Sequence, residues 1–345
     1  MKRRVITSIA AASLAFSCAL ALSLGAHAES PADFYHKRQI RMIVGHEAGN
    51  DYDLAARFLA RYLAKHIPGE PTITVQNMPA AASLAAANYL YVQAPRDGSV
   101  IGSFSRNVPS QARMGQANLE VDPRRFNWLG GTSHPARVCA RWFTVPINTP
   151  ADLFTREFIV AGAGAASSLS ILPTVFNHVL GTKFRIVQGY KGTTHTVLAM
   201  ERGEVEGACM SYLQLRIYEE LIRDGKIVFI LRAEETPIAE APELPSMFDY
   251  AKTEEQRALM RFVFSSTEFG RPYVLPPDVP KDRVEAMRKA IADTLADPEL
   301  IAEAARIKLD MSYRPPDALE RLVAQLYDAP AELIDTVKKL VPSIQ

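Results

Sequence analysis

Short apolar runs alternate with longer amphipathic stretches in the first part of this chain. Strands are predicted at 40–44, 72–76 and 99–104, where apolar residues are concentrated and turn residues follow. Between them, helices are predicted from Asp53 to the turn at Pro68-Gly69 and over 80–92, each with one apolar face. This alternation is typical of α/β units with largely parallel sheets.

A second series of the same kind begins after Trp128 and two glycines. Its predicted strands lie at 137–143, 158–161, 183–188, 207–210 and 227–231, with helices at 168–180, 193–202 and 212–223. The segments 261–265 and 273–275 should return the chain to the first series, because the remaining residues are mostly helical and need an existing lobe to cover.

Together these patterns predict an α/β protein of two lobes, each a doubly wound, mostly parallel sheet with flanking helices. We expect lobe one at 29–137 and 270–345, and lobe two at 138–269.

The N-terminus has the features of a secretory signal peptide. Three basic residues at 2–4 precede an apolar run at 5–24, and Ala26-His27-Ala28 follows as a small-residue cleavage site. The alternative, an uncleaved membrane anchor, is disfavoured because polar residues dilute the run and small residues end it. We expect cleavage after Ala28 and a periplasmic protein.

Charge and cysteine content exclude several classes of function. Removal of 1–28 takes away three basic residues and no acidic ones, so the formal net charge changes from +1 to −2. This leaves no strongly basic surface for nucleic acid. No later segment is apolar enough to span a bilayer. Cys139 and Cys209 are too few for a zinc site, although an oxidising compartment would permit one disulfide between them.

Three loops rich in small residues, at 49–53, 162–168 and 189–194, come where a predicted strand ends and a helix begins. Such loops let backbone N–H groups approach an anion at the positive end of a helix. A single loop of this kind is most often only a turn followed by a helix cap. The second loop lacks the last glycine of a dinucleotide fingerprint, and no cofactor is expected.

Several motifs resemble the tripartite tricarboxylate transporter receptors, also called Bug proteins. The resemblance rests on IRMIV at 40–44, PGEPTITVQNMP at 68–79, APRDG at 94–98, GYKG at 189–192 and AMERGEVEG at 199–207. It covers nearly the whole chain after residue 28. It implies a type II periplasmic-binding fold, capture of a small organic carboxylate outside the cytoplasm, and delivery to the permease subunits of a tripartite tricarboxylate-type transporter. We expect a monomer.

Carried over by position, the resemblance assigns ligand contacts to loops from both lobes. The candidate ligand residues are Gly49, Asn50, Tyr52, Asp53, Ala82, Ser83, Ser105, Arg106, Ala163, Gly164, Ala165, Ser167, Ser168, Tyr190, Lys191, Gly192, Thr193 and Ser211. Arg106 is the only cation among the lobe-one loops, which makes it a candidate partner for a ligand carboxylate. The alternative is an exposed arginine at a helix start.

The chain also departs from its relatives. Asn50 and Asp51, preceded by His46 and Glu47, stand where relatives have a glycine-rich loop, and three alanines at 80–82 replace Gly-Ala-Gly. Added acids weaken anion binding unless they point away, which leaves room for an amide, an amino acid or an aromatic acid. Capping and solvated charge explain these acids more simply than a metal site, and none is expected.

Catalysis has little support in the sequence. It has no Gly-x-Ser-x-Gly elbow and no His-Glu-x-x-His motif, so we expect a binding protein and not an enzyme. Two alternatives remain open. One is an exported enzyme acting on a small carboxylate or ester, and the other is a receptor that presents its ligand to a sensor kinase.

Overall fold

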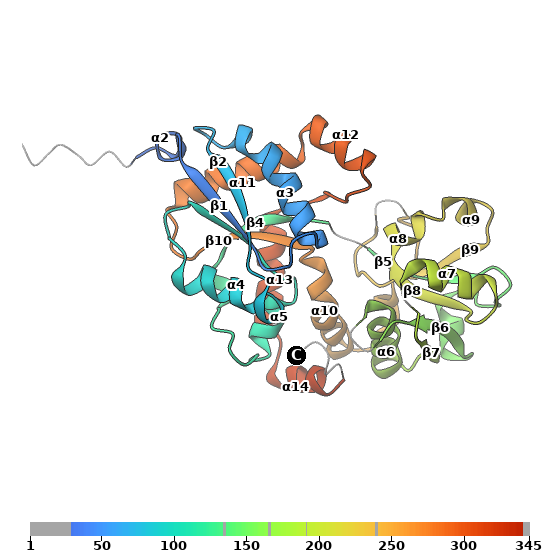
Figure 1. Ribbon diagram of the computed structural model, residues 1–345. Helices are drawn as coiled ribbons and strands as arrows, with labels where there is room; N and C mark the ends of the chain where they lie inside the picture. The colour runs from blue at the N-terminus through green and yellow to red at the C-terminus, as the bar shows by residue number, and fades with distance from the viewer. Residues whose placement is uncertain (1–28, 134–135, 165–166, 191, 239–240, 341–345) are drawn as a thin grey trace, which may run out of the picture.

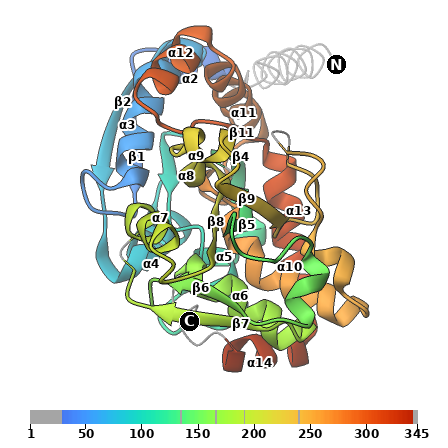
Figure 2. The same ribbon diagram turned by 90° about the vertical axis from the view of Figure 1, so that its right-hand side faces the viewer.

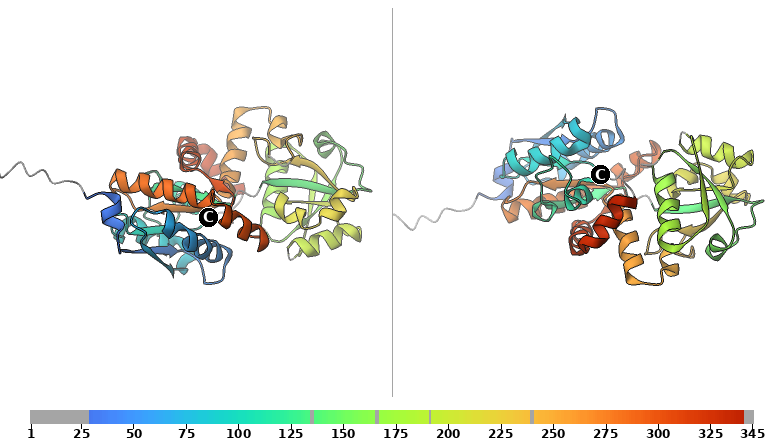
Figure 3. Two further views of the ribbon diagram at one scale, coloured as in Figure 1. Left: turned by 90° about the horizontal axis from the view of Figure 1, so that it is seen from above. Right: turned by 90° about the horizontal axis from the view of Figure 1, so that it is seen from below.

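The chain forms two α/β lobes, each built around its own sheet (Figure 1). The computed structural model describes residues 29–133, 136–164, 167–190, 192–238 and 241–340. Views from above and below show the lobes side by side along the long axis of the molecule (Figure 3). The predicted signal peptide at 1–28, Ala165 and Lys191 lie outside the described residues.

Lobe one contains a six-stranded sheet in the order β11-β4-β10-β3-β1-β2. Its strands are β1 (Gln39–Val44), β2 (Thr72–Asn77), β3 (Val100–Ser103), β4 (Asn127–Thr132), β10 (Arg271–Leu275) and β11 (Tyr313–Arg314). Strand β1 runs parallel to β2 and β3, and Val44 is in register with both Asn77 and Ser103. These three strands therefore end at the same edge of the sheet.

Helices cover both faces of this sheet. They are α2 (Pro31–Tyr35), α3 (Asp51–Leu63), α4 (Leu84–Asn88), α5 (Val108–Arg113), α11 (Lys281–Leu295), α12 (Pro298–Arg306), α13 (Pro316–Asp328) and α14 (Ala331–Leu340). Because side chains alternate along a strand, Met42 and Val44 of β1 enter the core beneath α3 and α11, while Ile43 enters the core on the opposite face. Helix α3 begins two residues before the predicted start at Asp53, with Asn50 as its N-cap.

Lobe two contains a five-stranded sheet in the order β7-β6-β8-β5-β9. Its strands are β5 (Arg137–Trp142), β6 (Phe158–Gly162), β7 (Phe184–Gln188), β8 (Gly207–Ser211) and β9 (Ile227–Arg232), and its helices are α6 (Ser168–Leu180), α7 (Thr193–Glu201), α8 (Tyr212–Arg216) and α9 (Glu219–Arg223). The single helix predicted at 212–223 is therefore two short ones.

Cys139 of β5 and Cys209 of β8 are directly paired across these antiparallel strands and form a disulfide. Both cysteines lie on strands that were predicted for lobe two, and the disulfide that the sequence permits is present.

The predicted two-lobed α/β fold is confirmed, with one correction to the strand directions. Parallel pairing extends over only part of each sheet: β10 is antiparallel to β3 and β4, and β5 is antiparallel to β8 and β9. Strands β5 and β10 are those by which the chain enters each lobe from the other. Because the crossing takes place at the edge where the parallel strands end, an entering strand must run in the opposite direction.

Helix α10 (Glu254–Glu268) returns the chain to lobe one and packs against both lobes. It contacts α6 of lobe two and α5, α13 and α14 of lobe one, and it lies beside α14 in two views (Figures 1 and 2). The predicted return segment 261–265 is part of this helix. No helix in the described part of the chain is long and apolar enough to cross a membrane.

The two crossing segments approach each other at Gly270. A Cβ at this position would lie 1.9 Å from the carbonyl oxygen of Ser133, and the φ of Gly270 is +58°. Only glycine permits this close backbone contact. The segment that leaves lobe one and the segment that re-enters it are thereby held side by side.

Candidate functional site

A cavity of about 460 Å³ lies between the lobes, a size suited to a small organic ligand. Both lobes contribute to its wall. The residues that line it are His46, Asp51, Tyr52, Ser105, Arg106, Asn107, Ser133, Thr267, Gly270, Arg271 and Asp310 from the lobe-one side, with Arg137, Ser211, Leu213 and Gln214 from lobe two. We refer to this cavity as the interlobe cleft.

Tyr52, in the first turn of α3, organises the lobe-one wall of the cleft. Its hydroxyl accepts a hydrogen bond from the Arg106 N–H at 3.2 Å and donates to the Gly270 carbonyl at 3.3 Å. The His46 ring stacks on the Tyr52 ring with centroids 3.9 Å apart. Burial raises the pKa of Tyr52 and lowers the pKa of His46, which favours the neutral form of both side chains.

Asp53 is a buried hydrogen-bond acceptor that holds together segments behind the cleft wall. Its side chain is only 2% exposed, and it accepts hydrogen bonds from the Gly49 N–H at 2.8 Å, Arg57 Nε at 2.9 Å and Asn77 Nδ2 at 2.8 Å. Burial opposes its ionisation, but these hydrogen bonds prevail and lower the pKa of Asp53. Asn50 caps α3 by accepting from the Tyr52 N–H at 3.0 Å.

Ser83 also supports the wall from behind. It is fully buried, and its hydroxyl accepts a hydrogen bond from the Ser105 N–H at 2.9 Å. A Cβ on Gly45 would lie 2.0 Å from the Ser83 hydroxyl oxygen, so the loop after β1 passes close to this side chain. Ser83 therefore positions the loop that carries Ser105 and Arg106.

Three arginines line the cleft, and two of them are paired with acids. Arg271 lies 3.3 Å from Asp51 and donates to the Asp310 carbonyl at 2.8 Å. Arg137 is 3.4 Å from Glu234 and donates to the Phe264 carbonyl at 3.3 Å.

Among the described residues, no hydrogen bond or ion pair is formed by the guanidinium of Arg106, which is half-buried. It is the one lining arginine that is available to an anion without breaking an existing pair.

Burial shifts the pKa values of charged groups behind the cleft. Desolvation lowers the pKa of Arg137 and raises that of Glu234, each opposed by the charge of the other. Burial also raises the pKa of Glu268, which pairs with Arg314 at 2.9 Å. These groups surround the two crossing segments, since Arg137 begins β5 and Glu268 ends α10.

The remaining candidates from lobe two belong to loops that follow β6 and β7. Gly164 donates its N–H to Gln188 Oε1 at 2.8 Å, and the Ser167 hydroxyl donates to the Gly164 carbonyl at 3.0 Å. Since β6 is parallel to β7 and β8, these loops lie at the same sheet edge as Ser211.

The structure brings four of the predicted site residues together in the cleft wall: Tyr52, Ser105, Arg106 and Ser211. Other candidates that the structure describes are not among its lining residues, namely Gly49, Asn50, Asp53, Ser83, Ala163, Gly164, Ser167, Tyr190, Gly192 and Thr193. The side chains of Ala82 and Ser168 lie outside the described part of the structure.

Sequence reasoning missed Arg137 and Arg271. Each is the first residue of a strand that enters a lobe from the other, and that position is the signal by which they could have been found.

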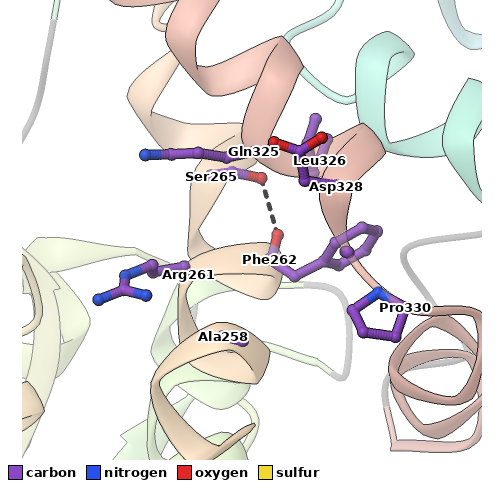
Figure 4. Close-up of a pocket in the computed structure, with 9 residues that line it drawn as sticks. Ala258, Arg261, Phe262, Ser265, Gln325, Leu326, Asp328 and Pro330 are labelled. Carbon is purple, nitrogen blue, oxygen red and sulfur yellow. Dashed lines mark hydrogen bonds between the residues drawn. The ribbon is translucent and has the colours of Figure 1, made fainter. Parts of the chain in front are cut away.

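A second cavity of about 220 Å³ lies between α10 and α13 and is less suited to an anion (Figure 4). Phe262, Leu326 and Pro330 contribute apolar surface to it. Arg261 extends away from Phe262 and Pro330, and it is ion-paired with Glu235 and Glu254. In the described parts of the chain, no group of three or more His, Cys, Asp or Glu side chains is placed to hold a metal ion.

Comparisons with known proteins identify the fold. No family model matches the chain. A UPF0065 protein in the gbd 5' region of Cupriavidus necator is 26% identical over 254 residues, which cover 69% of this chain and 72% of that protein. A TctC solute-binding protein from Polaromonas superposes with a TM-score of 0.68 at 18% identity, over 88% of this chain and 99% of that one.

Other solved structures are similar over the same extent. The periplasmic binding protein BugD has a TM-score of 0.53 at 20% identity and covers 89% of this chain and 98% of its own. MatC of Rhodopseudomonas palustris, solved with malate, and another R. palustris protein, solved with adipate, each have a TM-score of 0.50 at 17% identity, over 89% of this chain and 99% and 97% of theirs.

These likenesses establish the two-lobed periplasmic binding protein fold. The resemblance to TctC and Bug receptors that the sequence indicated is confirmed by these neighbours.

Proposed function

We propose that this protein is an extracytoplasmic solute-binding protein that captures a small organic carboxylate in the interlobe cleft. The observation that carries the proposal is the Arg106 guanidinium, which lines a cavity between two lobes and has no hydrogen-bond or ion-pair partner among the described residues. A carboxylate would pair with it in a partly desolvated site, where charge-assisted hydrogen bonds are stronger than in water.

Hydroxyl and amide groups around Arg106 would complete the binding site. Ser105 and Asn107 flank it in the sequence, and Ser211 lines the cleft from lobe two. Lobe closure would bring the described residues of the loops that follow β6 and β7, such as Ser167 and Thr193, toward the ligand, because these strands end at the same edge of the lobe-two sheet as Ser211. Malate and adipate in the related structures support a carboxylate as the ligand.

The ligand would then pass to the membrane subunits of a tripartite tricarboxylate-type transporter, and the protein would act in the periplasm. No bond is made or broken in this function. Incubation of each bound acid with the protein, followed by chromatography, would detect conversion, and recovery of the unchanged acid is the expected result.

A thermal-shift screen of ligand-stripped protein tests the binding function directly. Mono-, di- and tricarboxylates, aromatic acids and amino acids form the panel, because a ligand that binds only the native state raises its stability by mass action. At least one carboxylate should raise the melting temperature. A panel without any stabilising carboxylate would contradict the proposal.

Calorimetric titration of Arg106→Ala identifies the anion partner. Loss of a charge-assisted hydrogen bond should weaken binding by about 1.5–3 kcal/mol. Arg185→Ala is the matched control, because Arg185 is exposed, pairs with Glu157 at 2.9 Å and does not line the cleft. Equal affinities of Arg106→Ala and the parent protein would show that the carboxylate lies elsewhere.

A further inference from the structure

The charges that line the interlobe cleft determine how many negative charges a ligand can carry. Of the three lining arginines, Arg271 lies 3.3 Å from Asp51 and Arg137 lies 3.4 Å from Glu234. Only Arg106 has a guanidinium without a partner among the described residues. The cleft thus offers one guanidinium without an acid partner, which can receive one carboxylate.

The acidic side chains in the same wall disfavour binding of a second carboxylate. Asp51 lines the cleft with its side chain 62% exposed, so a ligand that enters meets its carboxylate. Asp310 lines the cleft as well; one of its oxygens accepts from the Ser312 N–H at 3.0 Å, and the other is buried with no hydrogen-bond partner among the described residues. Like charges this close repel, whereas an N–H or O–H donor would be attracted.

We propose that the cleft prefers singly charged carboxylates, with a neutral hydrogen-bond donor at the other end, over dicarboxylates, and that Asp51 sets this preference. The inference rests on the proposed function, because it takes the interlobe cleft as the ligand site. Asp51 acts in two ways: it occupies Arg271, which would otherwise receive a second carboxylate, and it repels that carboxylate directly.

The preference can be measured with ligands that differ in charge and hardly in shape. Succinate and adipate are each compared with their half-amides, succinamic acid and adipamic acid, by calorimetry at pH 7.5. The half-amide keeps the length and one carboxylate, and it replaces the other carboxylate with a neutral donor. In the unmodified protein, the better-bound half-amide should bind at least about 10-fold more tightly than its diacid, which corresponds to about 1.4 kcal/mol.

Asp51→Asn then tests the residue. The variant removes the negative charge and with it the ion pair to Arg271, so the ratio of the two affinities should shift toward the diacid by at least about 10-fold. Asp317→Asn is the matched control: Asp317 is also in the first turn of a helix, its side chain is 61% exposed, it pairs with Arg321, and it does not line the cleft. It should leave the ratio unchanged.

The outcomes separate this inference from the proposed function. Tighter binding of a diacid than of its half-amide by the unmodified protein would overturn the charge preference while carboxylate capture stands. A ratio that Asp51→Asn does not change would overturn the role of Asp51. If none of the four acids binds at millimolar concentration and the broader carboxylate panel also fails, the proposed function itself falls.

Discussion

Replacement of Asp53 by Asn should destabilise the protein without removing any ligand contact. The buried carboxylate accepts hydrogen bonds from three donors, the Gly49 N–H, Arg57 Nε and Asn77 Nδ2, all within 2.9 Å. Asparagine has the same shape but only one acceptor oxygen, so its amide group must face a donor. Asn77 cannot compensate by flipping its amide, because it also donates to the His46 carbonyl and accepts from Arg57.

The cost follows from this local geometry. At least one charge-assisted hydrogen bond is lost, and at least one buried donor is left without an acceptor, each of which costs about 1–3 kcal/mol. The Arg57 side chain is 47% exposed, so water can accept hydrogen bonds from part of its guanidinium. We therefore expect a total cost near the lower end of the sum of these two contributions. The free energy of unfolding of Asp53→Asn should fall by about 2–4 kcal/mol.

Urea denaturation without ligand measures this loss. Trp128 is in lobe one and Trp142 in lobe two, so a Trp142→Phe background reports the unfolding of lobe one through tryptophan fluorescence. Asp317→Asn is again the control, since Asp317 and Arg321 have the same i, i+4 spacing as Asp53 and Arg57 but both are exposed. An exposed pair of this kind should change stability by less than about 1 kcal/mol.

The pH dependence has a defined sign. The pKa of Asp53 is lowered in the folded protein, so its ionised form stabilises the fold above the unfolded pKa of about 3.9. The difference between parent and Asp53→Asn should be complete at pH 7 and should shrink as the pH falls below about 4. An unchanged urea midpoint together with weaker ligand binding would refute the reasoning and return Asp53 to the ligand site.

Three further predictions concern the fold and the cleft. Joint replacement of Cys139 and Cys209 by serine should lower the free energy of unfolding of lobe two by about 2–4 kcal/mol in denaturant titrations, because the disulfide joins residues 70 positions apart; equal midpoints would contradict this. X-ray scattering should give a smaller radius of gyration with saturating ligand, and an unchanged radius would argue against lobe closure. Ser167→Ala should weaken ligand binding by about 1–3 kcal/mol if closure brings Ser167 to the ligand, and an unaltered calorimetric affinity would exclude that contact.

Much of the fold was predictable because its signals are local. The alternation of apolar runs and amphipathic stretches predicted β1, β2 and β3 to within one or two residues, and it predicted α6 at its observed bounds. By contrast, β4 was not predicted, since Gly130 and Gly131 weaken its strand pattern. A Cβ on Gly131 would lie 3.0 Å from the Phe269 carbonyl, so close packing against a distant segment explains those glycines.

The candidate site likewise contains residues that local sequence features predict and residues that they do not. Small residues and caps before a helix are local features, and they identified the loop at 49–53 that contains Tyr52. Ser105, Arg106 and Ser211 were assigned by the family resemblance, and they also line the cleft. Whether a loop side chain faces the cleft or the interior depends on partners far away in the sequence.

Tertiary structure alone decided the rest. It turned Asp53 inward, where Asn77 of β2 meets it, and it brought Arg137 and Arg271 into the cleft from the two strands that cross between the lobes. It also paired Arg271 with Asp51, which is 220 positions away, and left the Arg106 guanidinium without a partner among the described residues. Hydrophobic periodicity and helix capping depend on neighbouring residues, so the sequence predicts them. The charge in a cleft depends on which distant residues the fold brings together.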